Sequence, residues 1–167
     1  MNFIDAARIV LTKDEGTGVI GRPGKPYRDS AGYWTIGIGH FIGLTLTEIE
    51  LSQRVMDEML MEDIERHLKD ARMVIGEEVF DMLPVARQVA ILSLVFTLGR
   101  NKFLQFNKTI RAIKEGAWED AATQVLKSKW AQDVDPKQRV NEGRDDRIAY
   151  MLRNGELHPA YGQKVVV

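Results

Sequence analysis

The sequence predicts an α+β fold, a mostly helical large lobe plus a small β-containing lobe joined by a long helix. Three observations carry this prediction: an amphipathic N-terminal stretch, a glycine-rich region with alternating residues, and a helical period that returns at Thr45. The 167 residues suffice for one domain, 1–167, with a sizeable core. We expect the small lobe at approximately 15–60 and the large lobe at approximately 1–14 and 72–167.

The N-terminal stretch is predicted to be a helix over residues 3–13. Its apolar residues Phe3, Ala7 and Val10 recur at helical spacing. A polar run and a glycine then end the pattern, so Glu15 is expected at the helix exit.

The region from Gly16 to Gly43 is rich in glycine and contains an alternating run from Tyr33 to Ile38, which predicts a small β-meander or hairpin region. Strand parity gives this run an apolar core face and a second face with a hydroxyl and two glycines, which a bulky ligand can approach closely. The two sets are Trp34, Ile36 and Ile38, and Tyr33, Thr35, Gly37 and Gly39.

A long helix is predicted to begin near Thr45. Thr45 and Thr47 are each followed three residues later by an acid, which is the capping-box signature. Apolar residues at helical spacing continue to about residue 72. A helix of this length is suited to bridging two lobes.

The second half of the chain predicts a helical lobe. Residues 85–98 are apolar nearly all round, which indicates a buried helix entered at Pro84 and stopped at Gly99. Further helices are predicted around 108–114, from Trp118 to about Lys129, and from Pro136 to about Leu152.

Composition excludes several function classes. The chain has no cysteine, and its three histidines show no metal-ligand spacing, so we predict no metal or other cofactor. The net charge of −1 gives no electrostatic case for nucleic acid. No segment has the length of a membrane span, and the N-terminus does not resemble a signal peptide.

Charge is unevenly distributed along the chain. Residues 1–82 hold 9 Lys and Arg against 15 Asp and Glu, whereas residues 83–167 hold 14 against 9. The second half is therefore the better surface for a polyanion, although solvated faces of a small protein can differ this much by chance.

Two carboxylates flank the glycine-rich region. Glu15 stands at the helix exit and Asp29 at the turn before the alternating run, so both can face one cleft. Glycosidic cleavage requires one protonated carboxyl group and one ionised one. Carbonyls at a helix end oppose negative charge, which suits Glu15 to the acid role. Each residue alone could instead be an ordinary helix-end or turn carboxylate.

The segment from Glu15 through Asp29 to GYWTIGIGH, residues 32–40, resembles the active-site signature of the phage-type (T4-like) lysozymes, the endolysin family of glycoside hydrolases. The resemblance covers roughly residues 1–153. It implies that Glu15 is the general acid, that Asp29 activates the water and that Thr35 positions it. The implied reaction is hydrolysis of the β-1,4 bond between N-acetylmuramic acid and N-acetylglucosamine, with inversion. A non-catalytic peptidoglycan-binding module and a lytic transglycosylase are the alternatives.

The resemblance also implies supporting and substrate-binding residues. His40 would be structural rather than catalytic, with Asp63 as its carboxylate partner on the long helix. The positions that match sugar contacts are Phe41, Phe96, Thr109 and Gln124, although Phe96 lies on an apolar helix and fits the core equally well.

The implied partner is bacterial peptidoglycan. Without a signal peptide, such a protein is expected to stay in the host cytoplasm until release, and to reach the wall after a holin-type permeabilisation. We expect a monomer, because the enzyme must penetrate a polymer mesh, and no stable membrane insertion.

Overall fold

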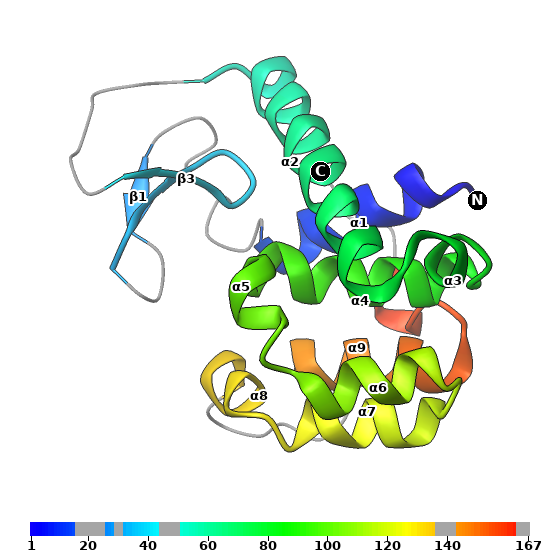
Figure 1. Ribbon diagram of the computed structural model, residues 1–167. Coiled ribbons are helices and arrows are strands. Elements are labelled where there is room, and N and C mark those ends of the chain that lie inside the picture. The colour runs from blue at the N-terminus through cyan, green and yellow to red at the C-terminus, as the bar shows by residue number, and fades with distance from the viewer. Residues whose placement is uncertain (16–25, 29–31, 44–50, 136–142, 163–167) are drawn as a thin grey trace.

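The computed structural model describes residues 1–15, 26–28, 32–43, 51–135 and 143–162, and it has the predicted α+β fold (Figure 1). A small three-stranded antiparallel sheet lies beside a larger group of helices. The elements in chain order are α1 (Phe3–Glu15), β1 (Tyr27–Arg28), β2 (Trp34–Ile36), β3 (His40–Gly43), α2 (Gln53–Ile75), α3 (Glu77–Asp81), α4 (Val85–Leu98), α5 (Arg100–Phe103), α6 (Asn107–Lys114), α7 (Trp118–Leu126), α8 (Lys129–Val134), α9 (Arg144–Asn154) and the 3-10 helix η2 (Pro159–Tyr161).

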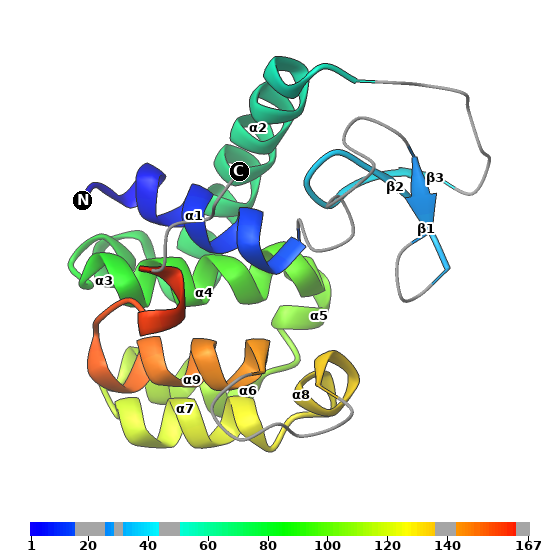
Figure 2. The same cartoon turned by 180° about the vertical axis from the view of Figure 1, so that it is seen from behind.

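Helix α4 is the centre of the helical part, as its apolar sequence predicts. It begins after Pro84, ends at Gly99 with a positive φ, and has a continuous buried run from Val89 to Val95. Helices α1, α2 and α9 pack against it, and Figure 2 shows η2 next to α1 on the same side. This burial is the main source of stability, because each fully buried Val, Leu or Ile side chain contributes about 1.5–3 kcal/mol.

The sheet is a hairpin with one added strand, and it corrects the predicted parity. Strand β2 ends at Ile36, and Gly37 and Gly39 have positive φ in the turn that leads to β3. Gly37 is buried, and a Cβ at this position would lie 3.3 Å from Cγ of Met56. The prediction that Gly37 and Gly39 line an open strand face is therefore wrong, because alternation stops where the chain turns and Gly37 packs on α2.

Helix α2 begins later than predicted. Ser52 is its N-cap, and the Ser52 hydroxyl accepts a hydrogen bond from the Val55 N–H. The predicted capping boxes at Thr45 and Thr47 lie outside the described residues. Leu51 and Ser52 are not helical, so the helix that joins the sheet to the helical part is shorter at this end.

Two further boundaries in the second half differ from prediction. The helix expected from Trp118 to about Lys129 is two helices, because Ser128 interrupts it and caps α8 by accepting from the Ala131 N–H. The helix expected from Pro136 begins at Arg144, after the N-cap Gly143; residues 136–142 lie outside the described part. Helices α3 and α5 and η2 were not predicted, since each is five residues or fewer.

Within the described ranges, no helix is long and apolar enough to cross a membrane.

Candidate active site

Thr35 lies at the middle of β2, where the sheet buries it. Its residue exposure is 4%, and its partner across the hairpin is Phe41 on β3. Partners directly opposite in a sheet project to the same face, so Thr35 and Phe41 share one face. The Thr35 hydroxyl lies 3.5 Å from the carbonyl oxygen of Tyr33, the long limit of a hydrogen bond. It therefore keeps most of its capacity to bind another oxygen, such as a water.

Two aromatic rings stand exposed on this part of the sheet. Tyr33 is 46% exposed and Phe41 is 58% exposed. Their ring centroids are 5.7 Å apart and their planes are 86° apart, an edge-to-face pair. The pair presents a rigid apolar surface next to Thr35, of the kind that packs against the C–H face of a sugar ring.

The two predicted catalytic carboxylates are placed only in part. Glu15 is the last residue of α1, and that end of the helix points toward the side on which the sheet lies (Figure 2). Its side chain is outside the described part of the structure, as is the whole of Asp29, which follows β1 in sequence. The convergence of the two carboxyl groups stays a prediction.

Asp14, the residue before Glu15, anchors the end of α1. Its side chain is fully buried, and its carboxylate accepts from Arg147 at 2.5 Å and from the Tyr161 hydroxyl at 3.0 Å. Arg144 is a further ion-pair partner at 3.5 Å. These contacts tie α1 to α9 and η2, so the backbone that carries Glu15 is held from two elements far along the chain.

The charges of this network follow from its burial. Burial raises the pKa of Tyr161, and the negative charge of Asp14 adds to the shift, so the hydroxyl stays protonated as a donor. Burial opposes the charge of Arg147, but Asp14 and Tyr161 outweigh it and the pKa of Arg147 is raised. Arg147 therefore keeps its positive charge beside Asp14.

His40 and Asp63 form the contact that the resemblance implied. His40 Nδ1 lies 2.8 Å from Asp63 Oδ2, which joins β3 to α2. Asp63 Oδ1 accepts from Arg66 at 2.5 Å, and its backbone carbonyl contacts His67 Nδ1 at 2.7 Å. Burial raises the pKa of Asp63, but the His40 hydrogen bond and the positive charges of His40, Arg66 and His67 lower it by more, so the net shift is downward.

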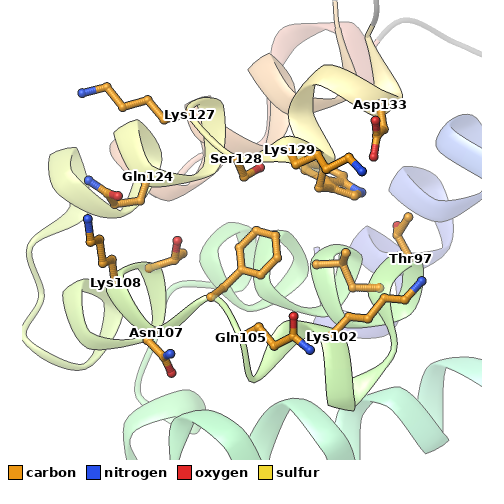
Figure 3. Close-up of a pocket in the computed structure, with 14 residues that line it drawn as sticks. Thr97, Lys102, Gln105, Asn107, Lys108, Gln124, Lys127, Ser128, Lys129 and Asp133 are labelled. Carbon is orange, nitrogen blue, oxygen red and sulfur yellow. The ribbon is translucent and has the colours of Figure 1, made fainter.

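A groove of about 880 Å³ lies between the α4–α6 and α7–α8 segments. Thr109 and Gln124, two predicted substrate-binding residues, both line it. Figure 3 shows one bank formed by Lys102, Gln105, Asn107 and Lys108, and the opposite bank by Gln124, Lys127, Ser128, Lys129 and Asp133. Four lysines against one aspartate make the groove basic, as the charge of the second half of the chain predicts.

Phe96 does not line this groove. Its ring is partly buried, packs against the main core and lies 4.8 Å from the ring of His67. Phe41 stands apart on the sheet, so the structure brings Thr109 and Gln124 together and leaves the two phenylalanines elsewhere.

A family comparison decides what kind of protein carries these features. The phage lysozyme family model matches residues 19–147, which include Asp29, Thr35 and His40. The chain belongs to the phage lysozyme family.

Relatives of this lysozyme-family chain occur in two very different sources. It is 22% identical to "Probable T4-type lysozyme 1" and 24% identical to "Probable T4-type lysozyme 2", both from Dictyostelium discoideum, over 93% of this chain and 98% of each relative. It is 29% identical to the pre-baseplate central spike protein Gp5 of Enterobacteria phage T4, over 93% of this chain and 29% of that protein. Family membership supports a lysozyme-type peptidoglycan hydrolase, with peptidoglycan as the substrate.

Sequence reasoning missed several residues of this lysozyme-family site. Arg147 and Tyr161 are 133 and 147 positions from Asp14, and no local pattern joins them. Tyr33 precedes β2, and its contact with Phe41 depends on the hairpin register. The four lysines of the groove were not predicted individually. The sequence indicated them only through the net positive charge of residues 83–167.

Proposed function

We propose that the protein hydrolyses the β-1,4 bond between N-acetylmuramic acid and N-acetylglucosamine in bacterial peptidoglycan, with inversion. The observation that carries this proposal is the position of Thr35, buried on β2 opposite the exposed Phe41, within the segment that matches the phage lysozyme family. This pairing supports the proposal because it puts a hydroxyl beside an exposed apolar ring, which we propose contacts the sugar.

Glu15 is the proposed general acid. It lies at the C-terminal end of a helix, where the last carbonyl groups disfavour a negative charge and favour the protonated carboxyl group. A protonated Glu15 gives its proton to the leaving glycosidic oxygen, which lowers the barrier to bond cleavage. The contacts of Asp14 with Arg147 and Tyr161 hold the helix end that carries Glu15.

Asp29 is the proposed base and Thr35 the residue that positions the water. Inversion needs a water between the sugar and the base, and the two carboxyl groups are then about 6.5–9.5 Å apart. The ionised Asp29 accepts a proton as the water attacks the anomeric carbon. The Thr35 hydroxyl, which has only a long contact to Tyr33, is suited to hold that water.

The basic groove is the proposed seat for the remainder of the polymer. Peptidoglycan carries carboxylates on its peptide stems, and Lys102 and Lys129 present opposite charge on facing banks. Gln124 would supply a polar contact within the groove and Phe41 an apolar contact on the sheet, while Thr109, which is only 2% exposed, would contribute at the floor of the groove. We retain Phe96 as a proposed contact, next to His67 at the end of α4.

In its biological setting we propose an endolysin that acts as a monomer. It would remain in the host cytoplasm, reach the wall after holin-type permeabilisation, and cause host lysis. Its single domain would divide into a small lobe at approximately 15–60 and a large lobe at approximately 1–14 and 72–167. The similarity to the phage T4 spike protein favours one second candidate, a lytic component of a phage particle.

Product analysis tests the reaction. Purified peptidoglycan is digested with the protein, and the released muropeptides are analysed by mass spectrometry and proton NMR. Hydrolysis with inversion predicts fragments heavier by one water, with the α-anomer formed first. A 1,6-anhydro end without added water would identify a lytic transglycosylase, and binding to the wall without any product would identify a binding module.

A further inference from the structure

His158 caps the short 3-10 helix η2 through a ring nitrogen. Its Nδ1 accepts a hydrogen bond of 3.1 Å from the Ala160 N–H, and its backbone carbonyl accepts from the Tyr161 N–H at 2.9 Å. Pro159, the first residue of η2, has no N–H, so the Ala160 amide is the one at this end that needs a side-chain acceptor. His158 therefore supplies both acceptors at the start of η2.

The hydrogen bond to Ala160 requires the neutral form of His158. A backbone N–H is always a donor, so the Nδ1 that accepts it carries no proton, and the proton of the neutral ring is on Nε2. In the imidazolium form both ring nitrogens are donors, and a proton on Nδ1 would face the Ala160 N–H. The cap therefore exists only while His158 is neutral.

The surroundings of His158 also favour its neutral form. Within the described ranges, the titratable groups next to its ring come from α1, α9 and η2, and they are Lys13, Asp146, Arg147, Tyr150 and Tyr161. Burial is the largest cause that lowers the pKa of His158 below its ordinary value of 6.5. The positive charges of Arg147 and Lys13 add to this shift, and the negative charge of Asp146 opposes it.

Helix η2 holds Tyr161 against the end of α1. The Tyr161 hydroxyl donates to the buried Asp14 carboxylate at 3.0 Å, and Arg147 Nε donates to that hydroxyl at 3.1 Å. Lys13 donates to the Ala160 carbonyl oxygen. Two consecutive residues of α1 are thus joined to two consecutive residues of η2, which lies next to α1 in Figure 2. The position of η2 therefore decides whether Tyr161 can reach Asp14.

We propose that His158 is a pH-sensitive latch, whose neutral ring holds η2 on α1 and whose protonation at Nδ1 releases the first turn of η2. The proton comes from the solvent, and the Ala160 N–H loses its acceptor. A released η2 no longer holds Tyr161 on Asp14, the residue before Glu15. The latch is a property of the fold, and only its effect on catalysis rests on the proposed role of Glu15.

The direction of the pH dependence follows from the lowered pKa of His158. Between the folded value and the ordinary value, the unfolded chain binds more protons at this residue than the folded chain does. The contribution of the cap to stability is therefore complete above pH 6.5 and is lost as the pH falls through the folded value.

Amide hydrogen exchange measured by NMR tests the latch without any substrate. Protection factors of the Ala160 and Tyr161 amides are followed from about pH 7.5 to about pH 4.5, together with the ring resonances of His158. We expect both protection factors to fall roughly fivefold on acidification, the factor for loss of a typical N-cap. The midpoint should match that of the ring and lie below pH 6.5. The Ala131 amide, which the Ser128 hydroxyl caps in α8, is the internal control and should stay protected.

Two substitutions at position 158 separate the latch from other titrations. His158→Asn keeps a side-chain acceptor for the Ala160 N–H that does not titrate, so protection should be high across the range. His158→Ala has no acceptor, so protection should be low across the range. Full protection of the wild-type Ala160 amide at about pH 4.5 would overturn the proposal, as would an equal loss in His158→Asn. If His158→Ala does not fold, the wild type and His158→Asn decide the question.

Discussion

His40 Nδ1 and Asp63 Oδ2 are 2.8 Å apart, and this contact fastens the small sheet to α2. The sheet carries Thr35 and Phe41, so its attachment sets where the proposed water-positioning hydroxyl lies relative to the helical part. We propose that His40, which lies inside the signature sequence, has a structural role and holds the sheet on α2.

Replacing Asp63 should destabilise the protein in a pH-dependent way. Asp63→Asn removes a charged acceptor from His40 and Arg66 and is expected to lower the unfolding free energy by about 1.5–3 kcal/mol at pH 6. Because the pKa of Asp63 is lowered in the fold, its contribution is present above the unfolded value of about 3.9 and is lost as pH falls through the folded value. Urea unfolding at pH 6 and pH 3 measures the difference, which should shrink at pH 3. Glu62→Gln, an exposed neighbour, is the control, and an equal loss in both variants would contradict the account.

Loss of the Arg147 side chain from its contact with Asp14 should lower the free energy of unfolding substantially. Arg147→Met leaves a fully buried carboxylate without its closest cation and is expected to cost about 3–5 kcal/mol. Tyr161→Phe removes one hydroxyl and should cost about 1 kcal/mol. Tyr150→Phe serves as the control, because the described residues offer its hydroxyl no hydrogen bond. Chemical denaturation measures the free energy of unfolding of the three variants. If Tyr161→Phe lowers it no more than Tyr150→Phe does, the hydrogen bond from Tyr161 to Asp14 does not stabilise the fold.

The turn between β2 and β3 should tolerate only glycine at position 37. Gly37→Ala forces a side chain into a left-handed conformation and against Met56, with an expected cost of about 1–3 kcal/mol. Gly32→Ala has the same kind of strain with open space around the Cβ and should cost less. Gly162→Ala, where φ is negative, should change stability by no more than about 0.5 kcal/mol. Thermal unfolding measures the loss of stability in each of the three variants. A larger loss for Gly32→Ala than for Gly37→Ala would contradict the packing of Gly37 on α2.

The groove lysines should promote wall hydrolysis electrostatically. The double variant Lys102→Gln/Lys129→Gln is expected to lower kcat/KM on purified peptidoglycan about 3- to 10-fold at low ionic strength. The deficit should nearly vanish near 1 M salt, where charges are screened within about 3 Å. Lys114→Gln, on the same helix as Lys108 but outside the groove, should have wild-type activity. A deficit that persists in high salt would argue for a role other than electrostatic attraction.

The sequence predicted the elements whose signals are local. Helix α4 was confirmed because an apolar run lies between Pro84 and Gly99, both of which interrupt helices for reasons independent of context. Helix α2 begins at Gln53 with Ser52 as its N-cap, later than the predicted start near Thr45. The apolar period predicted the helix but not its first residue, because the ends of helices are less sharply encoded than their centres.

The site was predictable only where it coincides with one short segment. Thr35 and His40 lie in a single nine-residue string, and their neighbours are fixed by a hairpin. The Asp14 network and the groove each combine residues from elements far apart in the chain, such as Lys102 and Lys129. Such contacts depend on how the helices pack, and no periodicity of one segment encodes them.

The measurement that tests the central claim most directly is the release of reducing ends from purified peptidoglycan by Glu15→Gln. The variant removes the proposed proton donor and keeps the size and polarity of the side chain, so its Tm should match wild type. We expect its rate to fall by at least about 100-fold, the range of general acid catalysis, while Glu58→Gln, an exposed position on α2, has wild-type activity. A folded Glu15→Gln protein that hydrolyses the wall at the wild-type rate would contradict the account.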